Sequence, residues 1–456
     1  MKVGIVGGYV VDPAAGIDGV ADILVDGPTI ARVSRRGVDP PPALGSGAHE
    51  INASGLLVFP AFIDLHAHLR EPGHLEKETV ASGSEAAAAG GFGTVCAMPN
   101  TMPVVDSPNV AATVVGLARA ARKARVIPVG SLTAGRESER LADYRTLNDA
   151  GCLFFSDDGR DVGQAQVLRD ALRGLKDIGS FAAIHAEDSS LFVGGVMHGG
   201  AVSARLGFSG IPASCESVAV ARAVLLAEEV GARVHICHVS AAQSVDVIRW
   251  AKARGIRVTS EVTPHHLTLT DEAVAKVGAL AKVNPPLRTE ADRQALVAAL
   301  ADGTIDCVAT DHAPHTAAEK GRPMLDAPFG IVGLETAFPL LYTRLVKTGA
   351  LTLSRLVEAL TAKPWNVLSG GQPAVWSAYD GGRVRFGTVA AGASADLCAF
   401  DLTADRRIRG SEFRSLCKAT PFEGEQVFGC ARLTIVKGGV VFEGESAGGR
   451  KREARK

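Results

Sequence analysis

The chain of 456 residues carries 48 Lys and Arg against 49 Asp and Glu, which gives a formal net charge of −1. Hydrophobic residues make up 46% and charged residues 21%, a composition that is typical of globular proteins and excludes wholesale disorder. The balanced charge provides no global basic field for nucleic acid, and no apolar run approaches the ~20 residues of a membrane-spanning helix.

The two ends of the chain have β texture. Residues 1–58 hold short β-like runs separated by turn residues, and similar runs return from about residue 378. We therefore predict that residues 1–58 and 378–456 form one small β-sandwich module. The basic terminal segment Gly448–Lys456 is predicted to be a solvated tail.

Cysteine usage and the N-terminus bear on the compartment. The eight cysteines are scattered, with no C-x-x-C pair, and several lie inside apolar runs. This pattern favours buried free thiols in a reducing compartment over a disulfide framework. The first residues reach Asp12-Pro13 too soon for a good signal peptide, so we expect a cytoplasmic protein.

Between residues 59 and 377, short apolar strands alternate with Ala-rich helical segments. Eight strands are predicted: Val58–Asp64, Thr94–Met98, Val126–Val129, Cys152–Ser156, Phe181–Ile184, Val234–Cys237, Val258–Val262 and Cys307–Thr310. Alternating β and α segments indicate parallel strands with crossover helices, and eight such units predict an α/β TIM (β/α)8 barrel. A doubly wound sheet is the alternative, although no G-x-G-x-x-G sequence opens a helix after a strand.

Polar residues follow several of the predicted strands, at the end where such barrels hold their active sites. They are the histidines and carboxylates His66, His68, Asp157, Asp158, His185, His238 and Asp311. His66 and His68 are two residues apart and so face the same side of a strand, with Arg70 on that side as well. Imidazole and carboxylate are zinc-type ligands, and more than four of them indicate two ions bridged by a carboxylate.

Roles within this set stay partly open. Alternation allows only one of Asp157 and Asp158 to face inward, without saying which. Asp311 can ligate a metal and act as general base, although a turn or N-cap aspartate is the alternative. Glu187 could support a ligating histidine from outside the ligand set. A further set of histidines is interpreted as structural: His235, His265 and His266.

The motifs then resemble a known family. The quoted runs are D-L-H-A-H-L-R-E-P-G at residues 64–73, M-P-N-T at 98–101, D-D-G at 157–159, V-N-P-P-L-R at 283–288 and T-D-H-A-P-H at 310–315. Together they resemble the amidohydrolase superfamily and, within it, class I bacterial dihydroorotases. The resemblance extends from the N-terminal β module to Thr420-Pro421-Phe422.

This resemblance implies reversible interconversion of N-carbamoyl-L-aspartate and L-dihydroorotate in pyrimidine synthesis. It implies two Zn2+ ions, one held by His66 and His68 and one by His185 and His238, with Asp158 bridging them and Asp311 both ligating and shuttling the proton. The implied substrate contacts are His68, Arg70, Asn100, Asn284, His315, Phe329 and Gly330. The segment 312–330 is interpreted as a mobile loop over the site.

Partners and rival functions follow from the same resemblance. The expected substrate is a small anion, the expected assembly a homodimer, and a complex with aspartate transcarbamoylase is allowed. Hydantoinase, dihydropyrimidinase and allantoinase are alternative functions, and these enzymes resemble one another in using a carboxylated lysine as the bridging ligand. At the corresponding position, the end of the fourth predicted strand, this chain has Asp157-Asp158 and no lysine. A non-catalytic subunit that scaffolds aspartate transcarbamoylase is expected to lose metal ligands, and this chain keeps them all.

Overall fold

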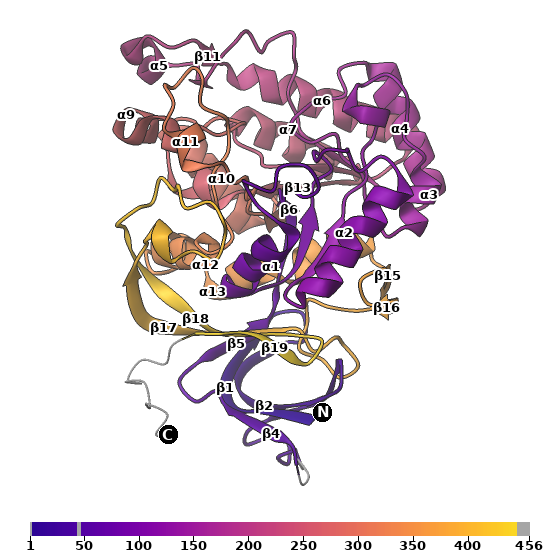
Figure 1. The fold of residues 1–456 in the computed structure, drawn as a ribbon, viewed down its shortest axis with the longest axis vertical. Helices are drawn as coiled ribbons and strands as arrows, with labels where there is room; N and C mark the ends of the chain where they lie inside the picture. The colour runs from indigo at the N-terminus through magenta and orange to yellow at the C-terminus, as the bar shows by residue number, and fades with distance from the viewer. Residues whose placement is uncertain (1, 43–46, 445–456) are drawn as a thin grey trace.

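The computed structural model describes residues 2–42 and 47–444 (Figure 1). The predicted tail Gly448–Lys456 lies outside these residues. All eight cysteines are free thiols and seven are buried, as predicted. Within the described ranges, none of the helices has both the length and the apolar character needed to cross a membrane.

Strands from both ends of the chain share one sheet of eight strands, in the order β19-β18-β17-β5-β1-β2-β3 with β4 paired to β1. Figure 1 shows the indigo and yellow strands side by side below the helices. The bounds are β1 (Lys2–Asp12), β2 (Ile17–Asp26), β3 (Thr29–Arg35), β4 (His49–Asn52), β5 (Leu57–Pro60), β17 (Leu397–Arg407), β18 (Gln426–Val436) and β19 (Gly439–Glu443). A short hairpin adds β15 (Val375–Ser377) and β16 (Gly382–Val384).

The predicted strand Val58–Asp64 is wrong as a single element, because it is divided between two sheets. β5 pairs with β1 and β17 in the terminal sheet, and β6 (Phe62–Ala67) begins the parallel strands. Pro60 has no N–H to donate and ends β5, and the Ala61 N–H donates to Asp396 across the terminal sheet. The predicted boundary between residues 58 and 59 therefore falls within β5.

The parallel strands form a three-stranded sheet, β6-β7-β8, and a four-stranded sheet, β14-β13-β12-β9. Their bounds are β7 (Phe92–Ala97), β8 (Arg125–Pro128), β9 (Ala182–Ile184), β12 (Val234–Ile236), β13 (Val258–Val262) and β14 (Cys307–Val308). Every residue of β6 and β7 is buried, as expected for strands covered on both faces. Isolated parallel bridges join Gly130 to Phe155, Phe155 to Ala182 and Ala67 to His312.

The predicted strand Cys152–Ser156 is not assigned as a strand. Phe155 makes a parallel bridge on each side, to Gly130 and to Ala182, and no longer ladder forms. Two residues later, the Asp157 side chain accepts hydrogen bonds from the backbone N–H groups of Leu132 and Thr133. These side-chain contacts take the place of further backbone pairing with that segment.

Helices follow most of the parallel strands and surround them in Figure 1. Their bounds are α1 (Val80–Ala89), α2 (Pro108–Ala121), α3 (Tyr144–Asp149), α4 (Ala165–Asp177), α5 (Ala201–Leu206), α6 (Ala213–Val230), α7 (Ala242–Ala253), α8 (Pro264–Thr268), α9 (Glu272–Val277), α10 (Glu290–Asp302), α11 (Ala317–Lys320), α12 (Ala337–Leu341), α13 (Leu353–Leu360) and α14 (Ala362–Ser369). Short turns and strands complete the chain: η1 (Ala134–Arg136), η2 (Gly278–Ala281), η3 (Tyr342–Val346), η4 (Gly410–Glu412), β10 (Met197–His198) and β11 (Gly210–Ile211).

The terminal sheet is fixed to the parallel strands by aromatic packing and by one buried cation. Phe338 of α12 lies 4.3 Å from Phe400 of β17 and 5.3 Å from Phe62 of β6, measured between ring centroids. Arg125 of β8 is fully buried and donates to Asp380 at 2.6 Å and to Asp396 at 2.7 Å. These contacts hold the ends of the chain against the base of the parallel strands.

Candidate active site and metal centre

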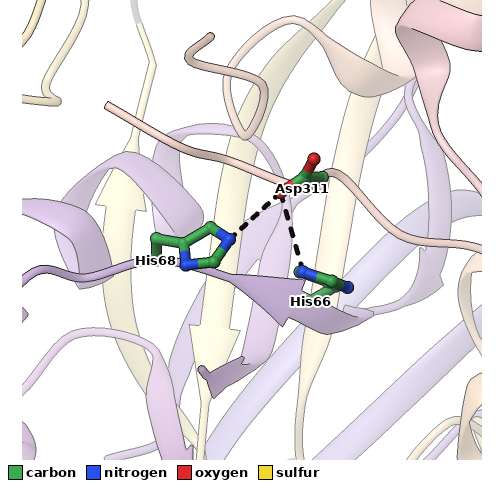
Figure 2. Close-up of side chains that lie close together, drawn as sticks. All are labelled: His66, His68 and Asp311. Carbon is green, nitrogen blue, oxygen red and sulfur yellow. Dashed lines mark hydrogen bonds and ion pairs between the residues drawn. The ribbon is translucent and has the colours of Figure 1, made fainter. Parts of the chain in front are cut away.

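Two histidines at the end of β6 meet an aspartate that follows β14. The Nε2 atoms of His68 and His66 lie 3.2 Å and 3.6 Å from Asp311 Oδ1 (Figure 2). A parallel bridge between Ala67 and His312 brings the two segments together. The predicted pairing of His66 and His68 on one side of a strand end is therefore what the structure contains.

Asp158 lies at the centre of the predicted ligand set. Its Oδ1 is 3.2 Å from His66 Nε2, 3.5 Å from His185 Nδ1 and 3.4 Å from His238 Nε2, and its Oδ2 is 3.3 Å from His68 Nε2. One carboxylate thus contacts all four predicted histidines.

The neighbouring aspartate points elsewhere. Asp157 Oδ1 accepts the N–H groups of Leu132 and Thr133 at 2.8 Å and 3.1 Å, and Oδ2 accepts the Thr133 hydroxyl at 2.5 Å. Its hydrogen-bonding capacity is used to hold the segment after β8. Asp158 is therefore the inward-facing residue of the pair, and Asp157 has a structural role.

Outer hydrogen bonds fix the orientation of the first two imidazoles. His66 Nδ1 lies 2.9 Å from Glu261 Oε1, and His68 Nδ1 lies 2.8 Å from Asn100 Oδ1. Both partners are acceptors, so in the neutral rings each Nδ1 carries the proton and each Nε2 keeps its lone pair for a metal ion. Ligating histidines commonly have this arrangement, with an outer acceptor on the second ring nitrogen.

These side chains fit a divalent metal. Among the described residues, His66 Nε2 is buried and has no hydrogen-bond partner. Four groups of His, Cys, Asp and Glu in the described chain hold their ligand atoms within 4.8 Å of one another. Two of these groups consist of predicted ligands only, namely His66, His68 and Asp311, and His66, Asp158 and His238. His185 Nδ1 and His238 Nε2 face each other at 3.0 Å. Imidazole nitrogen and carboxylate oxygen are the ligands that zinc takes in catalytic sites.

Charges in this cluster stabilise each other. Burial raises the pKa of Asp158, but His66 and the other imidazoles outweigh this effect and hold the pKa well below its ordinary value. Burial lowers the pKa of His66, but the Asp158 carboxylate outweighs that effect and raises the pKa. Asp158 therefore stays ionised in spite of its burial, and its carboxylate is available to a cation.

A cavity of about 210 Å3 opens beside this cluster. Its lining comprises nearly all the residues predicted for metal and substrate: His68, Arg70, Asn100, Asp158, His185, His238, Asn284, Asp311, His315, Phe329 and Gly330. His66 lies beneath them and is fully buried. A small ligand that enters the cavity meets the carboxylate–histidine cluster and Arg70 together.

Arg70 and His315 shape the polar side of the cavity. Arg70 donates through Nε to the Pro314 carbonyl at 3.3 Å, and its Nη2 lies 3.3 Å from His315 Nε2.

Arg70, His238 and Asp311 all have left-handed backbone conformations, with φ of 60°, 34° and 46°. These are three of the seven non-glycine residues with positive φ in the described chain, and such backbone strain gathers at functional sites.

The segment 312–330 is held by two buried lysines. Lys320 Nζ donates to the Pro328 carbonyl at 3.1 Å, and Lys282 Nζ donates to the Met324 carbonyl at 2.7 Å. The Gly330 N–H donates to the Lys282 carbonyl at 2.9 Å. The predicted mobility of this segment stays a prediction.

Several of the remaining polar residues have identifiable partners, whereas His265 Nε2 is buried without a hydrogen-bond partner among the described residues. Glu187 Oε2 accepts from Asn284 Nδ2 at 2.6 Å and lies 3.6 Å from His185 Nε2, which suits the predicted supporting role. His266 contacts the Thr263 hydroxyl and the Pro285 carbonyl, and His235 contacts Glu261. None of the histidines interpreted as structural lines the cavity.

Comparison with known proteins identifies the family of the chain. Residues 55–244 match the family described as "Dihydro-orotase-like". A dihydroorotase of Staphylococcus aureus (strain Mu50) is 46% identical over 425 residues, which are 93% of this chain and 96% of that protein. The chain belongs to the dihydroorotase family. A family member from Macrococcus caseolyticus is 47% identical over 398 residues, 87% of this chain and 90% of its own length.

Solved structures of related enzymes share the fold of this dihydroorotase family member. L-hydantoinase from Arthrobacter aurescens superposes with a TM-score of 0.84 at 28% identity, covering 97% of this chain and 96% of its own. Dihydropyrimidinase from Brevibacillus agri gives a TM-score of 0.79 at 23% identity, covering 97% and 95%, and shows the likeness of fold alone. The resemblance inferred from the sequence motifs is thus confirmed.

Sequence reasoning missed one buried residue of the dihydroorotase site. Glu261 lies in β13 and contacts His66 on one side and His235 on the other, at 2.9 Å and 3.1 Å. A charged residue inside the predicted strand Val258–Val262 was the available signal. Buried carboxylates are rare unless they are paired, so such a residue calls for a partner.

Proposed function

We propose that the chain is a dihydroorotase that interconverts L-dihydroorotate and N-carbamoyl-L-aspartate. The observation that carries this proposal is the 210 Å3 cavity in which Arg70 and His315 lie beside the cluster of four histidines and two aspartates. Dihydroorotate is a small ring with one free carboxylate. A fork-shaped cation suits that carboxylate, and a metal-binding cluster suits the ring amide.

Each cavity residue has a defined part in this proposal. Arg70, Asn100 and His315, with His68 beside them, hold the substrate's free carboxylate. Asn284 and the backbone at Phe329 and Gly330 contact the ring amide. This arrangement orients the scissile amide over the cluster of histidines and aspartates, which supplies the positional part of catalysis.

The cluster is proposed to hold two zinc ions. His66, His68 and Asp311 would bind one ion, His185 and His238 the other, and Asp158 would bridge them. When bound, such ions polarise a carbonyl and lower the pKa of water. Asp311 accepts the proton of the attacking water at its carboxylate and returns it to the ring nitrogen as the C–N bond breaks.

The finer architecture and assembly are proposed with the function. We propose that the parallel strands close into a (β/α)8 barrel, and the bridges from Phe155 to its two neighbours and from Ala67 to His312 support closure. The proposed domains are residues 59–377 for the barrel and 1–58 with 378–456 for the β module, with the first boundary moved to the end of β5 because β5 pairs within the terminal sheet. A cytoplasmic homodimer, with aspartate transcarbamoylase as a further partner, completes the proposal.

A hydantoinase or dihydropyrimidinase is the second candidate, favoured by the TM-score of 0.84 to L-hydantoinase. Two features favour dihydroorotase instead. Asp158 contacts all four histidines, and the cavity includes no lysine among its lining residues. Arg70 suits a carboxylate that dihydropyrimidines lack. A non-catalytic scaffold is disfavoured because every predicted ligand is present.

The test combines metal analysis with turnover of dihydroorotate, dihydrouracil and allantoin by the same preparation. Dihydroorotate is expected to be turned over with far the highest kcat/KM, in a protein that contains bound metal. A metal-loaded protein that is inactive on dihydroorotate refutes the proposal. Preferential turnover of dihydrouracil or allantoin supports the second candidate.

A further inference from the structure

Lys77 lies at the edge of the proposed carboxylate pocket, in the turn between β6 and α1. Its Nζ is 2.9 Å from Glu319 Oε1 and 3.4 Å from His315 Nδ1. The Lys77 side chain is 16% exposed and His315 is 8% exposed, so both are largely shielded from solvent. Neither the motifs nor the proposed mechanism gives Lys77 a role.

The neighbours of His315 determine which ring nitrogen carries the proton. A lysine ammonium can only donate, so His315 Nδ1 beside Lys77 must present its lone pair. The other nitrogen, Nε2, is 2.8 Å from the Phe329 carbonyl oxygen, which can only accept. Arg70 Nη2 also lies 3.3 Å from Nε2 and can only donate, but the Phe329 carbonyl is closer and Lys77 requires the lone pair on Nδ1. Together these contacts favour the neutral ring with its proton on Nε2.

The charge of His315 is consistent with this tautomer. Burial, together with the nearby cations Arg70 and Lys77, lowers the pKa of His315 to about 3. The ring is therefore neutral at physiological pH. In this tautomer, His315 Nε2–H and Arg70 Nη2 are two donors only 3.3 Å apart at the cavity wall. An oxygen of a carboxylate beside them would accept from Arg70 and would share the His315 Nε2–H with the Phe329 carbonyl in a bifurcated hydrogen bond.

We propose that Lys77 is a positioning residue that fixes the Nε2–H tautomer of His315, so that the ring donates a hydrogen bond to the free carboxylate of the substrate. This inference rests on the proposed dihydroorotase function. It makes Lys77 a determinant of selectivity for rings that carry a carboxylate.

Glu319 explains why the lysine is needed. Its Oε2 accepts from the Thr316 N–H and hydroxyl at 3.0 Å and 3.1 Å, and lies 3.7 Å from His315 Nδ1. Without the Lys77 ammonium, this carboxylate is the acceptor nearest to Nδ1. The Nδ1–H tautomer then gains an acceptor and competes with the Nε2–H tautomer that the Phe329 carbonyl favours. In the Nδ1–H tautomer, Nε2 turns a lone pair toward the substrate carboxylate, which repels it.

The first test is spectroscopic and uses the zinc-loaded full chain labelled with 15N-histidine. Lys77→Met is expected to shift the His315 resonances from the Nε2–H to the Nδ1–H tautomer. His315→Gln assigns those resonances. In the double variant Lys77→Met/Glu319→Gln, the side-chain amide can donate to Nδ1, so the Nε2–H tautomer is expected to return. Lys77→Arg is expected to keep it.

The second test is kinetic. Lys77→Met should raise KM for dihydroorotate by about 10- to 100-fold, with a smaller change in kcat and unchanged metal content, since a hydrogen bond to a charged group is lost. The double variant should recover most of this loss. Lys123→Met removes a lysine whose Nζ is 3.9 Å from Glu85 and serves as the matched control for loss of one positive charge.

The outcomes separate the two proposals. If Lys77→Met keeps the Nε2–H tautomer, or if its KM equals that of the wild type, the role of Lys77 is refuted. If the wild type does not act on dihydroorotate, the proposed function fails, whereas the tautomer measurement still decides what Lys77 does to His315. Should Lys77→Met not fold, the double variant and Lys77→Arg provide the same comparison.

Discussion

Glu261→Gln tests whether the buried carboxylate behind His66 supports metal binding. Glu261 is 1% exposed, and its two oxygens lie 2.9 Å from His66 Nδ1 and 3.1 Å from His235 Nε2. A glutamine keeps one accepting oxygen for His66. Its amide can donate to His235 if that ring moves its proton to Nδ1, where the Thr259 hydroxyl lies at 2.8 Å. The substitution therefore removes the charge and preserves both hydrogen bonds.

The expected magnitude follows from this geometry. Loss of an outer partner of a ligating histidine costs about 10- to 100-fold in metal affinity, or about 1.4 to 2.7 kcal/mol. Glu261→Gln should lie near the lower limit because only the charge is lost. Glu261→Leu should reach the upper limit, because His66 Nδ1 then loses its acceptor as well.

Competition between the protein and a chelator for zinc measures these affinities, with metal content after dialysis as a second readout. Glu335→Gln is the matched control, since Glu335 is also a buried carboxylate but accepts from the N–H groups of Arg414 and Ser415 outside the cavity lining. Zinc affinity of Glu261→Gln equal to that of Glu335→Gln would refute the reasoning.

Three further predictions concern other parts of the molecule. Arg70→Ala should raise KM for dihydroorotate by about 10- to 100-fold through loss of charged hydrogen bonds, while metal content stays constant; loss of metal would mean that Arg70 is structural. Burial raises the pKa of Glu335 to about 7 from the ordinary 4.5, so the folded state keeps a proton that the unfolded chain releases. Its contribution to stability should fall by about 3 kcal/mol as pH rises from 4.5 to 7, and thermal melts of Glu335→Gln should lack that part of the pH dependence. Arg125→Met removes the guanidinium from two buried aspartates, of which, in the described chain, only Asp380 keeps another cation, Lys437 at 3.2 Å, and should lower the free energy of unfolding by about 3–5 kcal/mol. Recovery of part of that loss in Arg125→Met/Asp396→Asn, measured by calorimetry, is the check.

Much of the site was readable from the sequence because strand ends in a parallel architecture meet on one face. His66, His185 and His238 each follow an apolar run, and the structure brings all three to Asp158. Alternation left Asp157 and Asp158 undecided, since it depends on a backbone orientation that no local pattern specifies. The hydrogen bonds from Leu132 and Thr133 make that choice, and they are tertiary contacts.

Other features could not be predicted from local patterns. The apolar run Val58–Asp64 reads as one strand, but its pairing with β17 is decided by a segment far away in the chain. The contacts of Lys77 with Glu319 and with His315 likewise join residues more than 230 positions apart. The spacing of hydrophobic residues shows which face of a strand or helix is buried. It does not show which distant residues come into contact, because those contacts depend on how the loops are arranged above the strands.

The sheet built from both ends of the chain has a consequence for biosynthesis. β5 lies between β1 and β17, and the contact from Cys398 to Pro60 spans 338 positions. At translation rates of 5–20 residues per second, roughly 20–70 s pass between synthesis of these two strands. During that interval the β5 edge has no partner and is open to pairing with other nascent chains. Correct folding therefore depends on protecting this edge on the ribosome, and premature termination before β17 is expected to yield an aggregating fragment.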